Sequence, residues 1–342
     1  MKESQLSAEF SVQILQQIEG FAEYGFPESH SASFALLVYA SAYLKVHHQA
    51  AFTCAILNSQ PMGFYAPRTL IADAQRHGIL VRGADIQESQ WDCRLEPFRD
   101  SKGSRSYALR IGFRLIKGLQ RREAEKLIDF RNREDGFKGL SDLERIPGVG
   151  RKSWKLLASA GALESFGVDR RNALWAVSGF KQGEADLLTG HESLYEDIVL
   201  PKSSDLDELV ADYRSMGFCL HTHPLSLVRE RFIREGVLYT KELMETSDGS
   251  NVEVAGIVVS RQQPSTASGV LFIALEDEKG MINVVVWPKV FQQYRDIAGG
   301  ASILRVKGRL ERQGLVANLI AYRFEAIRLR NYAFQAKSRD FH

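Results

Sequence analysis

The sequence predicts a multidomain fold that is mainly α-helical at first and ends in a small all-β barrel. Three observations predict it. Apolar residues recur at helical spacing over residues 7–58, a glycine-rich turn joins two predicted helices near residue 148, and five strand-like segments follow Val252. A length of 342 residues allows two or three domains, and the content of 44% apolar and 25% charged residues is typical of globular proteins.

The first part of the chain is predicted to consist of helices and a loop. Phe10, Ile14 and Ile18 form a stripe with the helical period. A second helix, from about Ala32 to His48, is apolar on most sides, which predicts that it is buried. Prolines and glycine mark a loop over residues 58–67. Further helices are expected at residues 68–77, where Gly78 is placed to cap the end, and at residues 121–132.

The segment just before the Ala32 helix combines aromatic rings with a helix start. Tyr24 and Phe26 offer flat faces on which a base could stack, and Ser29 is a good N-cap residue next to His30. The free N–H groups and the positive dipole end of such a helix form a seat for phosphate oxygens. A capped helix with two core aromatics explains the same residues, and the pattern alone leaves both interpretations open.

A second motif, Leu143-x-x-Ile-Pro-Gly-Val-Gly150, predicts a helix-hairpin-helix. Gly148 and Gly150 permit backbone conformations that a Cβ would forbid and let the turn approach a DNA phosphate closely. Arg151 and Lys152 would neutralise adjacent phosphates without reading the base sequence. The alternative is an ordinary pair of helices joined by a glycine turn. The residues around Lys117, Ile-Lys-Gly-Leu, form a degenerate version of the same turn.

From Val252 the apolar pattern changes from the helical period to that of strands. Five strands are predicted near residues 252–259, 270–275, 282–287, 303–308 and 315–321, with one helix from Pro288 to about Ile297. This order is that of an OB-fold, a small barrel that binds single strands. The aromatic and cationic residues that suit such binding are Phe272, Trp287, Arg305, Lys307, Arg309 and Tyr322. Trp and Phe in a small barrel also serve as core residues.

Charge is strongly segregated although the net charge is only +2. Residues 99–133 hold eleven Lys/Arg and four Asp/Glu, and residues 301–342 hold nine Lys/Arg and three Asp/Glu. Residues 184–212, by contrast, hold one Lys/Arg and nine Asp/Glu. The two basic zones coincide with the two nucleic-acid-binding patterns, so the charge supports DNA as a partner.

Other classes of protein are excluded by what the sequence lacks. No segment has the roughly 18 uncharged apolar residues needed to span a bilayer, so no membrane partner is expected. Three scattered cysteines do not form a disulfide framework, which favours a cytoplasmic location. Cys219, His221 and His223 invite a zinc site, but structural zinc needs four ligands in paired clusters and no second cluster exists, so no metal site is expected.

The motifs together carry a resemblance. The run Tyr24-Gly-Phe-x-x-Ser-His-Ser-Ala32, with Leu44-Lys45-x-His47 after it, resembles the fingers region of bacterial C-family DNA polymerases, the polymerase III alpha subunits. Pro27-Glu28 stands where replicative members carry Asn-Lys. With the run Leu57–Tyr65, it resembles the error-prone, damage-induced branch of the family.

The resemblance implies the DNA- and nucleotide-binding C-terminal part of an error-prone polymerase that acts in translesion repair. It places Tyr24, Ser29, His30 and Lys45 near the incoming nucleoside triphosphate. Duplex DNA would lie on the helix-hairpin-helix and single-stranded template on the OB-fold. The sliding clamp and other translesion factors are further possible partners.

The resemblance also implies that catalysis belongs elsewhere. In the family, the metal-binding aspartates lie in a palm domain upstream of the fingers. Neither Asp205 with Asp207 nor Glu276 with Asp277 offers carboxylates converging on two metal ions. We therefore expect no catalytic residue and no bound cofactor in this chain, which would be inactive alone, while the complete polymerase would use Mg²⁺.

Five regions are expected on these grounds: fingers-like helices at residues 1–97, the helix-hairpin-helix region at 98–175, a mixed helical and acidic connector at 176–249, the OB-fold at 250–330 and a tail at 331–342. Three alternatives to the polymerase part remain. They are a stand-alone, non-enzymatic DNA-binding protein, a subunit that docks onto a separately encoded palm, and a protein-interaction role for the acidic 184–212 segment.

Overall fold

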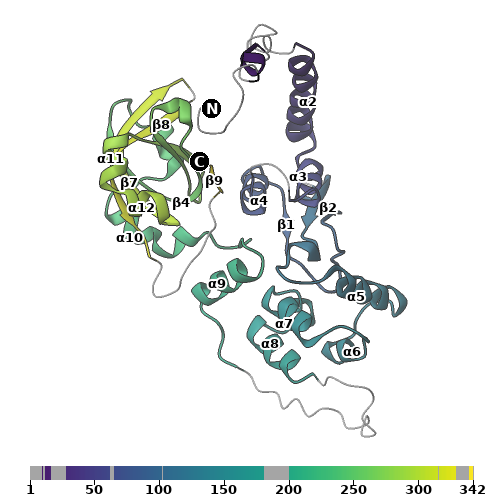
Figure 1. Ribbon diagram of the computed structural model, residues 1–342. Helices are drawn as coiled ribbons and strands as arrows, with labels where there is room; N and C mark the ends of the chain where they lie inside the picture. Colours follow the sequence, from purple (N-terminus) through teal and green to yellow (C-terminus); the bar gives the residue numbers. More distant parts are fainter. Residues whose placement is uncertain are drawn as a thin grey trace. The chain divides into compact units, whose positions relative to one another are not determined.

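A computed structural model describes residues 10, 12–16, 28–61, 65–101, 103–180, 200–314, 316–328 and 339–341. The chain divides into two compact units, Met1–Phe52 and Thr53–His342. Figure 1 shows the order of the helices and strands along the chain.

The first unit contains a long helix, α2 (Glu28–His47), which begins four residues before the predicted start. The prediction that this helix is buried is wrong for the described residues, because Leu36, Tyr39 and Val46 are 70% or more exposed. A helix that is apolar on most sides needs neighbours on several sides to bury it.

The second unit starts with helical and mixed structure that surrounds one hydrophobic core. Its helices are α3 (Gln49–Asn58), α4 (Pro67–Arg76), α5 (Arg121–Arg133), α6 (Leu140–Glu144), α7 (Arg151–Ser159) and α8 (Arg170–Ser178), with 3₁₀ turns η1 (Phe113–Leu115) and η2 (Glu164–Phe166). A small sheet has the order β1-β3-β2, formed by β1 (Val81–Arg82), β2 (Arg94–Arg99) and β3 (Arg105–Arg110). The sequence pattern did not predict the β2–β3 hairpin.

A connector follows, and its helices pack on the barrel. It comprises α9 (Asp205–Ser215), η3 (Pro224–Val228), α10 (Arg229–Arg234) and η4 (Thr240–Met244). Leu209, Tyr213 and Phe232 from the connector share a core with Ala255 and Ile257 of the barrel. Most of the acidic segment 184–212 lies outside the described residues, and from Asp205 onward it forms α9.

The barrel is closed and has five strands, as predicted. Its strands are β4 (Asn251–Gln262), β5 (Leu271–Glu276), β6 (Met281–Val286), β7 (Ile303–Gln313) and β8 (Val316–Ala326). They follow the cyclic order β4-β5-β6-β8-β7, and β6 runs parallel to β8. This is the OB-fold order. The remaining elements are the turn η5 (Ser265–Ala267), the helices α11 (Pro288–Gln293) and α12 (Arg295–Gly300), and β9 (Arg339–Phe341), which pairs with β4.

One detail of the barrel departs from the sequence pattern, and another explains a glycine. The single helix predicted after Pro288 is two short helices, because the chain turns at Tyr294. Gly308 lies where β7 and β8 shift register. A Cβ there would lie 2.5 Å from the Ile320 carbonyl oxygen, so only glycine allows the two strands to approach this closely.

Candidate nucleic-acid interface

The Pro-Gly-Val-Gly turn joins α6 to α7 as the sequence predicted. Gly148 adopts φ +73°, in the left-handed region that favours glycine, and Gly150 is the N-cap of α7. Ile146, just before the turn, is buried and anchors it in the core. Within the described chain, the backbone N–H groups of Gly148, Val149, Arg151 and Lys152 meet no acceptor. The turn therefore presents several open donors at the positive end of a helix dipole.

Two side chains of α5 brace this turn, and sequence reasoning missed both. Glu123 accepts hydrogen bonds from the Gly150 N–H, at 2.8 Å, and from the Ser153 hydroxyl. Lys126 donates to the Gly148 carbonyl oxygen at 2.9 Å and so adds a positive charge beside the open N–H groups. Their only sequence signal was their position at the start of the predicted 121–132 helix, next to the degenerate turn.

The four residues predicted to hold duplex DNA are together, but their surroundings differ. Lys152 is exposed and makes no ion pair among the described residues. Arg151 instead donates to the Phe180 carbonyl oxygen at 2.7 Å, which ties α7 to the end of α8. Lys152 is thus the cation of this turn that is best placed for a phosphate.

The turn around Lys117 is a structural sister of the Gly148 turn. Gly118 has φ +83° and corresponds to Gly148 of the second turn. Ile116, two residues before Gly118, is buried in the same way as Ile146, two residues before Gly148. However, this sister turn is already covered. The Lys117 backbone N–H donates to the Ser215 carbonyl at 2.8 Å, and its ammonium donates to the Tyr213 carbonyl at 2.6 Å. Carbonyls at the end of α9 therefore take the place that a phosphate would take, and the structure places Lys117 against α9.

On the barrel, an apolar row crosses the outer surface of three strands and ends at an arginine on a fourth. Phe272 of β5 is paired with Val285 of β6, Val285 with Ile320 of β8, and Ile320 with Arg309 of β7. All four point outward, because the residues that alternate with them fill the barrel core.

Two further aromatic rings extend this row. Tyr322 lies two positions beyond Ile320 on β8, and Trp287 lies two positions beyond Val285, just after the end of β6. The two residues are 48% and 53% exposed. We call the surface formed by Phe272, Val285, Trp287, Ile320 and Tyr322 the aromatic face. It combines two exposed rings and the half-buried Phe272 with a cation at its border, the exposed Arg309, which lies 3.5 Å from the exposed Glu311.

Arg305 and Lys307, also predicted to bind DNA, lie on another part of β7 and are ion-paired. Arg305 contacts Glu253 at 2.5 Å and also Glu235, and its side chain is 12% exposed. Lys307 lies 3.2 Å from Glu253. Arg305 clamps α10 to the barrel, so its charge is largely neutralised by the protein itself.

The residues expected near a nucleotide are only partly described. Tyr24 lies outside the described residues, and so does the side chain of Ser29. Because α2 begins at Glu28, Ser29 lies inside its first turn rather than at its N-cap. His30 is exposed and packs its ring on Phe34, with centroids 4.4 Å apart, while Lys45 is exposed in the last turn.

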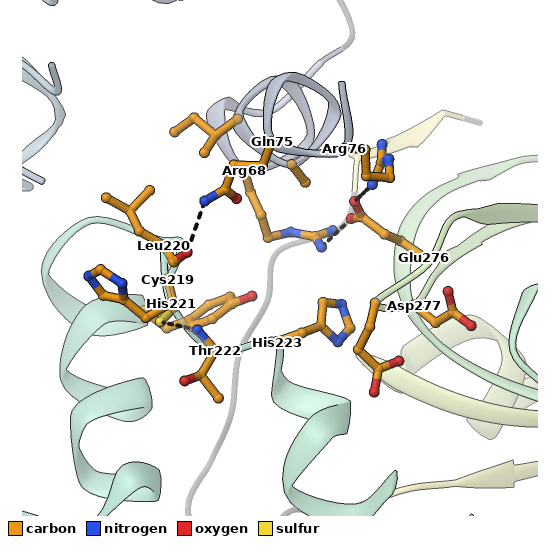
Figure 2. A pocket seen from close by; sticks show the side chains of 14 residues that line it. Arg68, Gln75, Arg76, Cys219, Leu220, His221, Thr222, His223, Glu276 and Asp277 are labelled. Carbon is orange, nitrogen blue, oxygen red and sulfur yellow. Dashed lines mark hydrogen bonds and ion pairs between the residues drawn. The ribbon is translucent and has the colours of Figure 1, made fainter. Parts of the chain in front are cut away.

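A cavity of about 310 Å³ lies between α4, residues 219–223 and the end of β5 (Figure 2). Arg68 and Arg76 converge on Glu276, whose side chain is 1% exposed, at 2.5 and 3.0 Å (Figure 2). Burial and the nearby Arg68 lower the pKa of His223 to about 3, so this ring is neutral at pH 7. The charges of the cavity compensate one another, which indicates a structural junction.

The carboxylates considered for catalysis have structural roles. The fully buried Asp277 accepts hydrogen bonds from the Thr240 N–H and hydroxyl, both at 2.7 Å. Asp207 forms a capping box with Ser204 at the start of α9.

Among the described residues, no group of three or more His, Cys, Asp or Glu side chains is arranged to hold a metal ion. No helix in the same set is long and apolar enough to cross a membrane.

Two segments of the chain match known families. Residues 78–173 match the helix-hairpin-helix motif, and residues 252–326 match the OB-fold nucleic acid binding domain. Together with the open turn and the aromatic face, these matches define a nucleic-acid-binding protein of the class that joins a helix-hairpin-helix to an OB-fold.

Relatives then identify the family. The chain is 43% identical to an error-prone DNA polymerase of Pseudomonas fluorescens (strain Pf0-1) and 44% identical to one of Alkalilimnicola ehrlichii, each over 100% of this chain and 33% of the relative. The chain corresponds to a portion of a bacterial C-family DNA polymerase of the error-prone branch, which confirms the resemblance found in the sequence. It spans about a third of the length of these curated relatives, which favour the polymerase portion over a stand-alone binding protein or docking subunit.

Two solved structures resemble part of the chain. An asparaginyl-tRNA synthetase from Pyrococcus horikoshii is 20% identical, with a TM-score of 0.23, over 27% of this chain and 23% of that one. A replication protein A heterotrimer bound to ssDNA is 17% identical, with a TM-score of 0.19, over 24% of this chain and 60% of that one.

Proposed function

We propose that this chain is the DNA-holding part of an error-prone DNA polymerase, with duplex DNA on the Gly148 turn and single-stranded template on the aromatic face. The observation that carries the proposal is the row of donors at the turn. Backbone N–H groups at a helix start, with Lys126 and Lys152 beside them, suit phosphate oxygens of any base sequence.

The aromatic face supports the single-strand role. Stacking of bases on exposed rings is worth about 1–3 kcal/mol per base and is independent of sequence. OB-folds use the face of their second and third strands for oligonucleotides. Half-buried Phe272 lies on the second strand, β5, and exposed Trp287 follows the third, β6, while exposed Tyr322 lies on the neighbouring β8. Arg309 at the border supplies a charge for the backbone.

In the complete polymerase, nucleotidyl transfer would use Mg²⁺ held by carboxylates of a palm domain. The chain's own residues would position duplex, template and nucleotide, with Tyr24, Ser29, His30 and Lys45 on the nucleotide side. Contacts with a sliding clamp and other translesion factors, and a cytoplasmic location, belong to the same proposal.

The duplex site is tested with Lys152→Ala in the full chain. Loss of one phosphate contact should lower the slope of log K against log salt by about 0.9 and weaken binding similarly on unrelated sequences. Lys155→Ala is the matched control, because Lys155 is an exposed lysine one turn further along α7. An unchanged slope in Lys152→Ala, or an equal loss in the control, would contradict the duplex site.

The single-strand site is tested with Phe272→Ala and Trp287→Ala. Each should weaken binding of an oligonucleotide by about 1–3 kcal/mol and leave duplex binding unchanged. Ile233→Ala removes an exposed apolar side chain of α10, away from the aromatic face, and should have no effect. Equal losses for single-stranded and duplex DNA would assign the face to another role.

A further inference from the structure

The β2–β3 hairpin ends in two arginines that face each other. The register of the two strands pairs Arg99 directly with Arg105. Like charges in directly opposite positions destabilise a pair of strands. Within the described chain, neither arginine makes an ion pair: Arg99 donates to the Gly103 carbonyl oxygen at 3.0 Å, and Arg105 is exposed with no hydrogen bond. The hairpin therefore carries a repulsion that nothing in the described protein relieves.

An exposed aromatic ring lies on the same face of the hairpin. The next pair toward the protein body is Pro97 with Tyr107, and Tyr107 is 53% exposed. The pair after that is Leu95 with the fully buried Leu109. One face of this ribbon thus leads outward from the core to a ring and then to two guanidinium groups. We call Pro97, Arg99, Arg105 and Tyr107 the hairpin face.

The opposite face of the same ribbon is different. There, Glu96 contacts Arg82, Arg94 and Arg110 at 2.8–3.2 Å, so those arginines are held by the protein. Residues 94–114 contain six Lys/Arg and two Asp/Glu. One of the two, Asp100, accepts the Ser104 N–H at 2.8 Å and shapes the hairpin loop. The excess positive charge of this segment is therefore directed to the hairpin face.

We propose that the hairpin face is a second DNA contact, which binds phosphodiester groups of the duplex with Arg99 and Arg105. The planar guanidinium group has the donor geometry for phosphate oxygens, and an anion between the two arginines would turn their repulsion into attraction. The Tyr107 ring packs against the sugar beside the bound phosphates. The hairpin belongs to the segment that matches the helix-hairpin-helix motif, and this makes DNA the ligand rather than an acidic protein. The inference rests on the proposed DNA-binding function and extends it to a new surface.

The test compares duplex binding by the full chain and by Arg99→Ala/Arg105→Ala over a range of salt. Loss of two phosphate contacts should lower the salt slope by about 1.8 and weaken binding at 0.1 M salt by roughly tenfold to a hundredfold. Arg234→Ala/Lys241→Ala removes two exposed positive charges from the connector and is the matched control, expected to keep the wild-type slope. Equal losses in both double variants would reduce the effect to net charge and overturn the inference.

Thermal stability distinguishes a binding role from a structural one. Because the two arginines repel each other, the double variant should melt at or above the wild-type temperature. Arg105→Glu, which places a carboxylate opposite Arg99, should raise the melting temperature further and still weaken duplex binding. A lower melting temperature in both variants would show that the arginines support the fold, which overturns the inference.

Two further results separate this inference from the function on which it rests. If Lys152→Ala weakens duplex binding and the hairpin variant does not, only the hairpin face is refuted. If the wild-type chain binds no DNA, the proposed function fails as well. Binding of poly-glutamate by the wild-type chain, lost in the hairpin variant while duplex binding is kept, would assign the surface to an acidic protein and overturn the inference.

Discussion

Glu96 offers a sharp test of how the helix-hairpin-helix segment is held together. Its carboxylate lies on β2 with a side chain only 10% exposed, and it receives hydrogen bonds from Arg110 at 2.9 Å, Arg82 at 2.8 Å and Arg94 at 3.2 Å. Burial raises the pKa of Glu96, but the hydrogen bonds from the arginines outweigh burial and lower the pKa to about 2, from an ordinary 4.5. In Glu96→Gln, the three guanidinium groups would face one another without the carboxylate.

The size of the effect follows from the shift in the pKa. One pKa unit corresponds to about 1.4 kcal/mol, so the shift amounts to roughly 3 kcal/mol of stability at neutral pH. Arg82 and Arg94 are 38% and 37% exposed, and solvent screens their part of the interaction. We therefore expect the free energy of unfolding of Glu96→Gln to be about 2 kcal/mol lower than that of the wild type at pH 7.

The pH dependence has a definite sign. A carboxylate whose pKa is lowered by folding stabilises the protein above its unfolded pKa, and this contribution is lost as the pH falls toward the folded value. The wild-type advantage over Glu96→Gln should therefore be complete above about pH 5.5. It should be smaller by about a quarter at pH 4 and by more than half at pH 3.

Urea unfolding measured by hydrogen exchange of peptides from β3 is a suitable assay. Glu88→Gln is the matched control, because Glu88 contacts only Arg94 of this cluster, at 2.7 Å, and is 54% exposed. An exposed pair of this kind is worth about 0–1 kcal/mol. Equal losses in the two variants, or a loss in Glu96→Gln that does not change between pH 7 and pH 3, would refute the reasoning.

Three further outcomes are expected. Glu123→Ala should lose about 1–3 kcal/mol of stability in urea unfolding, because the Gly150 N–H and the Ser153 hydroxyl lose a charged acceptor. An unchanged stability would show that Glu123 is not needed to hold the turn. Gly148→Ala should lose about 1–2 kcal/mol of free energy of unfolding, since φ is +73° and the new Cβ would lie 2.2 Å from the Lys126 ammonium. The variant should also bind duplex DNA more weakly in a titration. Wild-type stability and affinity would contradict this expectation. The purified chain should not extend a primer with dNTPs and Mg²⁺, and extension abolished by mutating this chain would overturn the assignment of catalysis to a palm domain.

Local patterns in the sequence determined the two folds that bind nucleic acid. The Gly148 turn is specified by a few adjacent residues, because only glycine adopts its backbone conformation without strain and Ile146 anchors it. The OB-fold was predictable for a similar reason: alternating apolar residues mark each strand, and the helix before the fourth strand selects one topology. The half-buried ring of Phe272 and the exposed ring of Trp287 were also singled out from the sequence.

Tertiary structure alone decided which charges remain available to a ligand. The sequence presents Lys117, Arg151 and Arg305 as cations equivalent to Lys152, yet their partners lie 29 to 96 residues away along the chain. The contacts of Glu123 with the turn depend on helix packing, and the position of Arg99 opposite Arg105 depends on strand register. A linear pattern contains the charge of a residue but not the distance to its counter-charge. Long-range packing sets that distance. It therefore decides whether a cation is paired within the protein or remains open to a phosphate.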